Sequence, residues 1–324
     1  MLDMSDTRIA PPALLPSPVP LLRPDLAAMR LDVAHRRGEV RRVAHGVYAP
    51  SHLWDPLPPW QRYLARVHAH ALKCPNAVYC LESAAVLLGL PVTGSLAEIH
   101  VLSRSTAGRR VGDVRLHVTS EERDVVSEGG LLLLSAEDTA VDLARHRHPA
   151  VALMAADATL RLTGRSDPGV LADTNESRAS SRGRARARWA IERATPLAET
   201  ALESLSRAIV EWLGFPEPEL QVAFPAADGG EYRSDMYWRG PDVIGEADGR
   251  IKYDGTFGDD SRRLWREKRR EDELRRAAAG FARWGAEEVN DPPQLEAILL
   301  GAGVPRVRPR SAAPLLSLRS ALRA

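Results

Sequence analysis

The spacing of hydrophobic side chains in the first half of the chain predicts short helices and strands in alternation. Residues 39–48 alternate apolar and polar side chains around a turn at 44–46, which is typical of a β-hairpin. Apolar residues at intervals of three and four predict helices at 25–37, 60–73, 81–88, 136–145 and 149–162. Short apolar runs predict strands at 98–102, 114–118 and 131–134. This half is therefore expected to be α+β.

The pattern changes after residue 162. Residues 163–181 are rich in Gly, Ser, Asp and Asn, which favours a linker. Beyond it, helices are expected at 197–213, 262–279 and 293–301, and strands at 220–224, 232–238, 243–248 and 280–284. This order predicts an α/β unit in which a mixed sheet is flanked by helices.

These patterns divide the chain into six segments. Residues 1–24 contain six prolines and are expected to form an extended, partly disordered arm. The other segments are a helix-plus-hairpin unit at 25–58, a middle α/β domain at 59–162, a linker and basic helix at 163–195, a second α/β domain at 196–303 and a tail at 304–324.

Composition narrows the class of protein. Of the 324 residues, 44% are hydrophobic and 27% are charged, which is typical of globular domains. The net charge of +1 means that any affinity for a polyanion must come from local charge. Two cysteines exclude a disulfide framework and a cysteine-rich zinc site. No long apolar run or secretion signal is evident, so we expect a cytoplasmic protein that does not enter a membrane.

Positive charge gathers around the first hairpin. Residues 30–45 carry a net charge of +3, and we expect Arg36, Arg37, Arg41 and Arg42 to contact DNA. A helix followed by a basic hairpin is how a winged helix meets DNA, with the hairpin cations on phosphates. The alternative is a solvent-exposed helix end and a purely structural hairpin.

The run from Arg37 to Pro50, RGEVRRVAHGVYAP, resembles the wing of the antitoxin domain in the AbiEi family of type IV toxin–antitoxin systems. Residues 81–91, LESAAVLLGLP, are similar to the helix that follows the wing in that family. The resemblance covers about residues 25–160. It implies DNA binding, often as a repressor, although the proline-rich arm replaces part of the usual helix-turn-helix.

Carboxylates cluster on two adjacent strands of the second domain. Side chains alternate faces along a strand, so Glu246 and Asp248 point to the same side, and Asp235 on the neighbouring strand can reach them. Converging carboxylates repel one another unless a cation lies between them, and oxygen ligands suit Mg²⁺ or Mn²⁺. The alternative is that these acids only cap turns, because Asp248–Gly249 is itself a turn signal.

The order of elements from 195 to 300 is similar to the PD-(D/E)xK nuclease superfamily, and in particular to its branch resembling very-short-patch repair endonucleases. The resemblance implies that Asp235 and Glu246 bind the metal and that Glu203, on the first helix, assists. Asp248 takes the place of the usual lysine, and a serine precedes Asp235 where the superfamily has proline. Lys252 or Lys268 could supply the missing cation, with Lys252 as the candidate catalytic residue.

Two further segments are basic. Residues 262–276 carry a net charge of +4 and residues 178–193 carry +5. We expect Lys268, Arg269 and Arg270 to contact DNA phosphates, while the alternative is a solvated helix face with internal ion pairs.

The sequence thus predicts a winged-helix-like α+β part followed by a restriction-endonuclease-like α/β core. The first hypothesis is a DNA-binding, Mg²⁺- or Mn²⁺-dependent DNA endonuclease. The second is a non-catalytic transcriptional regulator or antitoxin, and the third is an antitoxin that neutralises its cognate toxin by protein contact. DNA is the expected partner, a toxin is a partner under the alternatives, and the oligomeric state stays open.

Overall fold

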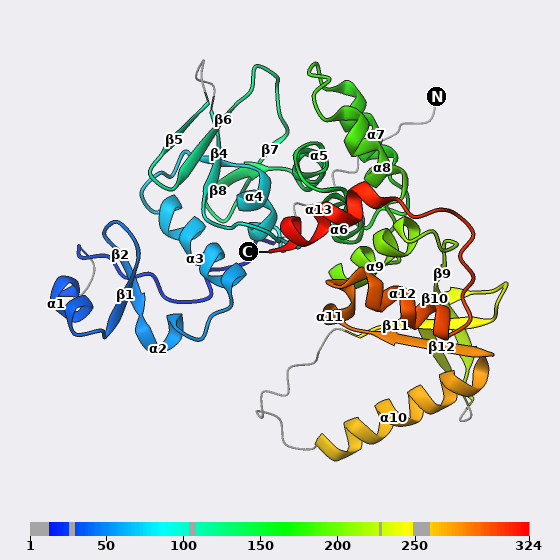
Figure 1. Cartoon of the computed structure of the whole chain (residues 1–324). Helices are drawn as coiled ribbons and strands as arrows, with labels where there is room; N and C mark the ends of the chain where they lie inside the picture. Colours follow the sequence, from blue (N-terminus) through cyan, green and yellow to red (C-terminus); the bar gives the residue numbers. More distant parts are fainter. Residues whose placement is uncertain (1–12, 26–29, 104–107, 227–228, 249–259, 324) are drawn as a thin grey trace, which may run out of the picture.

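The computed structural model describes residues 13–25, 30–103, 108–226, 229–248 and 260–323, without the side chains of residues 260–268. The described chain is α+β, with helices and sheets of two, four and six strands. Figure 1 shows the two-stranded hairpin at one end, the six-stranded sheet beside it and the four-stranded sheet at the other end, with a layer of helices between the two larger sheets.

The N-terminal unit is a short helix, a hairpin and two further helices. Its elements are α1 (Leu31–Arg36), β1 (Val40–Ala44), β2 (Val47–Pro50), α2 (Ser51–Trp54) and α3 (Pro59–Ala71). The predicted hairpin is confirmed. The described part of the proline-rich arm is extended, and Leu22 in it pairs with Tyr48 of β2. Residues 26–29 of the expected 25–37 helix lie outside the described residues, and the part described as helical begins at Leu31.

The middle sheet has the order β5-β6-β4-β3-β8-β7 and mixes parallel with antiparallel pairs. Its strands are β3 (Val78–Tyr79), β4 (Ile99–Ser103), β5 (Arg109–Val111), β6 (Val114–Val118), β7 (Val125–Glu128) and β8 (Leu131–Leu134). Helix α4 (Leu81–Leu87) is buried along its whole length against this sheet and α3.

A layer of helices links the middle sheet to the C-terminal sheet. It consists of α5 (Ala136–His146), α6 (Pro149–Leu162), α7 (Gly169–Ser177), α8 (Arg184–Glu192) and α9 (Ala201–Trp212). One hydrophobic core includes Leu153 of α6, Leu171 of α7 and Ile209 of α9. The segment expected to be a linker therefore contains a helix, because Leu171 anchors it in a core that crosses the expected domain boundary.

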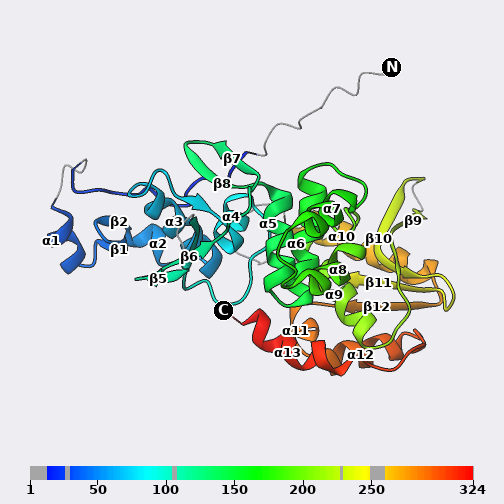
Figure 2. The same cartoon turned by 90° about the horizontal axis from the view of Figure 1, so that it is seen from above.

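The C-terminal sheet has the order β12-β11-β10-β9. Its strands are β9 (Glu219–Pro225), β10 (Glu231–Trp238), β11 (Val243–Ala247) and β12 (Gly280–Trp284). Strands β9, β10 and β11 are antiparallel neighbours, and β12 runs parallel to β11 after the crossover through α10 (Asp260–Ala277). Helix α10 covers one face, and α9, α11 (Ala286–Val289) and α12 (Pro292–Gly301) cover the other (Figure 2).

Gly245 allows the centre of this sheet to pack closely. A Cβ at this position would lie 2.7 Å from the ring of Trp284 and 2.8 Å from that of Trp238. A side chain would force these two indoles out of the core, at a cost typical of overpacking. Gly245 thus allows β11 to pack tightly against the two indoles, and this packing fixes the position of Glu246, the next residue on the strand.

The C-terminal segment also differs from the expectation of a tail. It contains α13 (Ala312–Leu322), which contacts α6 and α9 and buries Leu318 in the shared core. Within the described ranges, no helix is both apolar and long enough to cross a membrane.

Candidate functional site

The structure brings two of the predicted carboxylates onto facing positions of adjacent strands. Met236 of β10 pairs with Gly245 of β11, so Asp235 and Glu246 stand opposite each other on the face covered by α10. The backbone N–H of Asp235 donates to Glu246 Oε1 at 3.4 Å, and the backbone N–H of Ala247 donates to Asp235 Oδ2 at 2.8 Å. The two carboxylates are therefore held side by side by the strand backbones.

Their proximity changes the acidity of Asp235. Burial raises the pKa of Asp235 to about 7, and the negative charges of Glu246 and Glu203 contribute to the rise. Near neutral pH, the carboxyl group of Asp235 is therefore protonated in some molecules and ionised in the others. A cation placed between the carboxylates would favour the ionised form.

Glu203 lies at the start of α9 and has a clear structural role. Its Oε1 accepts a hydrogen bond from the Thr200 hydroxyl at 2.8 Å, and its Oε2 accepts one from the backbone N–H of Glu199 at 2.8 Å. Thr200 Oγ1 accepts the N–H of Glu203 in return, at 3.1 Å. The sequence Thr-x-x-Glu forms a reciprocal helix cap, which alone explains this acid. It nevertheless lies near enough to affect Asp235.

Gln221 is a neighbour that sequence reasoning missed. Its Nε2 donates to Glu203 Oε2 at 3.1 Å. The register between β9 and β10 places Gln221 opposite Asp235, and its φ of 56° is rare for a residue other than glycine. No sequence pattern could have identified Gln221, because the positive φ that sets it apart is a property of the folded backbone.

Asp248 takes a different partner from the other acids. Its Oδ2 lies 2.6 Å from Arg283 Nη2, and Arg283 also pairs with Glu271 of α10. Arg283 stands opposite Glu246 in the parallel pairing of β11 with β12. The four predicted acids therefore separate into a group of three around Asp235 and an arginine-bound Asp248.

The cation that the structure places at this site is Arg270. Its Nη2 donates to Glu246 Oε2 at 2.7 Å and to the carbonyl of Arg233 at 3.1 Å. Its neighbour Arg269 is exposed and pairs with Glu273 one turn further along α10. Lys252 lies outside the described residues, and of Lys268 only the position in α10 is described.

The donor set at this site fits a hard divalent cation. Asp235 and Glu246 supply carboxylate oxygens, and Mg²⁺ is commonly held by one or two carboxylates, with water and substrate phosphate completing its ligands. Among the residues described, no group of three or more His, Cys, Asp or Glu side chains is arranged to hold a metal ion.

The two predicted DNA contacts around α1 are exposed and weakly paired. Arg36 lies 3.6 Å from the carboxylate of Asp32, one helical turn before it. Arg37 lies 3.9 Å from Glu39. Exposed pairs at these distances contribute little to stability, so both cations remain accessible to a phosphate.

The hairpin arginines are also exposed. Arg41 forms a two-pronged pair with Asp55, at 2.9 and 2.8 Å, while Arg42 contacts the ring nitrogen of His45 at 2.7 Å. Arg41 must therefore leave a carboxylate before it can bind a phosphate. Arg42 has no carboxylate partner within 4 Å in the described part of the chain.

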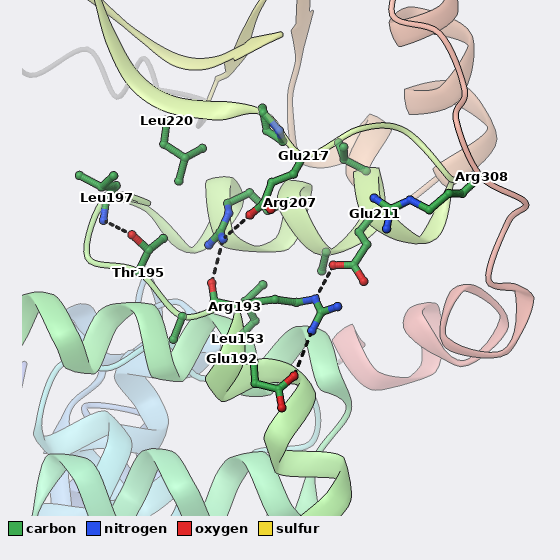
Figure 3. A pocket seen from close by; sticks show the side chains of 14 residues that line it. Leu153, Glu192, Arg193, Thr195, Leu197, Arg207, Glu211, Glu217, Leu220 and Arg308 are labelled. Atoms are coloured by element: carbon green, nitrogen blue, oxygen red, sulfur yellow. Dashed lines mark hydrogen bonds and ion pairs between the residues drawn. The ribbon is translucent and has the colours of Figure 1, made fainter. Parts of the chain in front are cut away.

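A cleft of 560 Å³ lies beside α9, between α8 and the start of β9 (Figure 3). Arg193 pairs there with Glu211 and Glu192, and Arg207 contacts the Arg193 carbonyl and Glu217. Each of these cations already has a carboxylate partner. The cleft therefore offers no uncompensated charge at these two arginines.

Two mycobacterial proteins are similar to this chain over two thirds of its length. No family model matches it. Over 219 residues, 67% of the chain, it is 30% identical to uncharacterized protein Rv2248 of Mycobacterium tuberculosis (strain ATCC 25618 / H37Rv), of which the match covers 76%. Uncharacterized protein MT2308 of strain CDC 1551 / Oshkosh matches with the same identity and coverage. The chain belongs to the same family as these mycobacterial proteins.

Proposed function

We propose that the protein is a DNA-binding, metal-dependent endonuclease whose active site lies on β10 and β11. The observation that carries the proposal is that Asp235 and Glu246 are held side by side, where burial and the negative charge of Glu246 together raise the pKa of Asp235 to about 7. Structural acids are normally separated or paired with cations, because bringing two carboxylates together costs free energy. Perturbed acids of this kind gather at functional sites.

Asp235 and Glu246 would hold Mg²⁺ or Mn²⁺, and the bound ion would polarise a phosphodiester and lower the pKa of water. Glu203, fixed by its cap and by Gln221, adds negative charge beside them. Arg270 can move from Glu246 to the negative charge of a phosphate, because a guanidinium binds either group through the same N–H donors. Lys252 keeps its proposed role as a charge stabiliser.

The arrangement of elements supports a restriction-endonuclease-like fold for this unit. Helix α9 precedes three antiparallel strands, and a helical crossover leads to a parallel β12. The order of helix, strand, strand with Asp235, strand with Glu246 and basic helix is that of the PD-(D/E)xK superfamily. The change of lysine to Asp248 is the main departure.

DNA binding is proposed for the N-terminal unit, as a winged helix with the β1–β2 hairpin as its wing. Support comes from Arg36, Arg37, Arg41 and Arg42, which are all exposed on α1 and β1 or directly after α1. Backbone contacts of this kind would position the protein without reading sequence.

A second candidate is a non-catalytic regulator, of the antitoxin type, with a toxin as partner. It is favoured by Arg270 on Glu246 and Arg283 on Asp248, which give two of the acids a counter-charge from the protein itself. In this reading the carboxylates stabilise the domain and bind no metal.

Cleavage of supercoiled plasmid in Mg²⁺ or Mn²⁺ separates the two candidates. Under the first proposal the wild-type protein nicks the plasmid and the Glu246→Gln variant does not. Absence of nicking by the wild type on DNA and on RNA would favour the regulator.

A further inference from the structure

A second pocket, of 360 Å³, lies between the end of β6, the end of α5 and the segment that connects α7 to α8. Four arginines line it, against two carboxylates, and these six residues are Arg123, Arg145, Arg178, Arg182, Glu121 and Asp142. We propose that this pocket binds a small ligand through a phosphate group. The inference is independent of the site on β10 and β11.

Two of the arginines are already compensated. Arg123 donates to Asp138 Oδ2 at 3.1 Å and to Asp142 Oδ2 at 2.6 Å. Arg178 donates to Asp138 Oδ1 at 2.5 Å and lies 3.9 Å from Glu121. In these contacts two guanidinium groups face three carboxylates, and neither Arg145 nor Arg182 takes part in them.

Arg145 is a buried cation without a carboxylate partner in the described part of the chain. It is only 6% exposed, one of its terminal nitrogens donates to the Ser180 carbonyl, and its Nε has no hydrogen-bond partner. Burial lowers its pKa, and the nearby Arg184 and Arg178 lower it further. The more distant charges of Glu121 and Asp142 favour the charged form of Arg145 but make no direct ion pair with it. An anion bound in contact with Arg145 would supply the direct counter-charge that a buried cation needs.

Arg182 stands at the mouth of the pocket. Its side chain is exposed, and no carboxylate lies within 4 Å of it among the residues described. The chain is held in place here by Gly183, whose φ is +75° and at which a Cβ would lie 2.3 Å from the Arg145 carbonyl. This close approach brings Arg182 and Arg145 to the same cavity.

The chemistry of the pocket suits phosphate. Guanidinium groups bind phosphate oxygens through paired N–H donors, and Thr119 and Ser120 add hydroxyls to the lining. Burial lowers the pKa of His146, and the charges of Arg147, Arg182 and Arg145 lower it further against the opposing charge of Asp142. The volume is near the lower end for small-molecule sites, which suits a mononucleotide-sized ligand and not a duplex.

Calorimetric titration of the full-length protein tests the proposal. The probes are inorganic phosphate, adenosine 5′-monophosphate and uncharged adenosine. We expect the first two to bind and adenosine not to bind. Because Arg182 would donate charge-assisted hydrogen bonds to the phosphate, Arg182→Ala should weaken binding of the monophosphate by about 10-fold or more.

Arg145→Met should weaken binding further, because it removes the buried cation and keeps the length of the side chain. If Arg145→Met does not fold, Arg182→Ala alone decides, since that residue is exposed. The matched control is Arg188→Ala, an exposed arginine on α8 that is paired with Glu176. It should leave affinity unchanged.

Three results would overturn the proposal. The first is that neither inorganic phosphate nor the monophosphate binds the wild type. The second is that the wild type and Arg182→Ala bind the monophosphate with equal affinity. The third is that Arg182→Ala loses affinity for duplex DNA while none of the small probes binds. The last result would assign the pocket to a nucleic acid.

Discussion

The backbone amide of Asp235 donates a hydrogen bond to the carboxylate of Glu246 at 3.4 Å, so that two acids on neighbouring strands share one small volume. The strand pairing imposes this arrangement, because the facing positions follow from the register. Burial and the nearby charge of Glu246 together raise the pKa of Asp235 to about 7, so this carboxyl is partly protonated near neutral pH. The relationship is costly for a structural site and useful for one that binds a cation.

The pH dependence of stability should reveal this cost. The pKa of Asp235 is raised from 3.8 to about 7 in the folded protein. Its protonated form therefore contributes stability that is fully present below about pH 4 and is lost as the pH rises through 7. Asp235→Asn should be more stable than the wild type at pH 8, by roughly 1–4 kcal/mol, and nearly equal at pH 4.

Thermal unfolding at both pH values, without added metal, measures the difference. The control is Asp173→Asn, the same change at an exposed position on α7. An equal effect of Asp235→Asn at pH 4 and pH 8 would show that the pKa of Asp235 is not raised in the folded protein.

Arg270 should compete with a metal ion for Glu246. Its guanidinium is 2.7 Å from Glu246 Oε2, so removing it leaves the carboxylates without that counter-charge. We expect Arg270→Gln to bind Mn²⁺ about 10-fold more tightly than the wild type, which corresponds to about 1.4 kcal/mol.

Calorimetry with Mn²⁺ measures this effect, with Arg269→Gln as the control on the same helix. Arg269 pairs with Glu273 instead of Glu246, so its removal should leave Mn²⁺ affinity unchanged. Weaker Mn²⁺ binding by Arg270→Gln than by Arg269→Gln would contradict the competition.

Much of this architecture follows from the hydrophobic pattern. The structure confirms the helix at 149–162 and the strands at 114–118, 131–134 and 280–284 with their predicted bounds. The alternation of side chains between the two faces of a strand also predicts that Asp235, on the neighbouring strand, can lie close to Glu246. These features depend on local periodicity, which a sequence displays directly.

Other features depend on tertiary contact. Helix α7 forms within a segment of linker composition because Leu171 enters a distant core, and α13 is fixed through Leu318 in the same way. The partners of Asp248 and Glu246 could not be predicted, because Arg283 and Arg270 lie 35 and 24 residues further along the chain and reach the acids only through tertiary contacts. Side-chain charge alone does not specify which cation reaches which acid.

The two parts of the chain on either side of the expected domain boundary at 163–195 should unfold together. Asp157 of α6 is fully buried and pairs with Arg207 of α9 at 3.1 Å, across the expected domain boundary. Burial raises the pKa of Asp157 to about 6 despite this partner. Asp157→Ala leaves Arg207 buried without this partner, and should lower the free energy of unfolding by about 3–5 kcal/mol.

Urea denaturation followed by circular dichroism tests this coupling, and the loss should appear in a single transition. Glu176→Ala removes an exposed partner of Arg188 and should change stability little. Two separate transitions, only one of them shifted by Asp157→Ala, would show that the halves unfold independently.

The hairpin arginines should determine the salt dependence of DNA binding. Replacing Arg41 and Arg42 together by alanine should weaken binding to all sequences alike, and should reduce the slope of log affinity against log salt by about two. Arg42→Ala should have the larger single effect, because Arg41 is shared with Asp55.

Fluorescence anisotropy over a salt series measures both slopes. Arg165→Ala, which removes an exposed arginine paired with Glu137, is the control. An unchanged slope in the double variant would make the hairpin a purely structural element.

The most direct test of the central claim is a paired measurement of cleavage and DNA affinity on the wild type and Glu246→Gln. The variant keeps the size of the side chain and removes the charge that would hold the cation, while the arginines of the N-terminal unit remain. We predict that the wild type nicks plasmid in Mn²⁺, that Glu246→Gln loses nicking at least 100-fold, and that the two bind DNA within a few-fold of each other. Equal nicking by both proteins, or none by the wild type, would contradict the account.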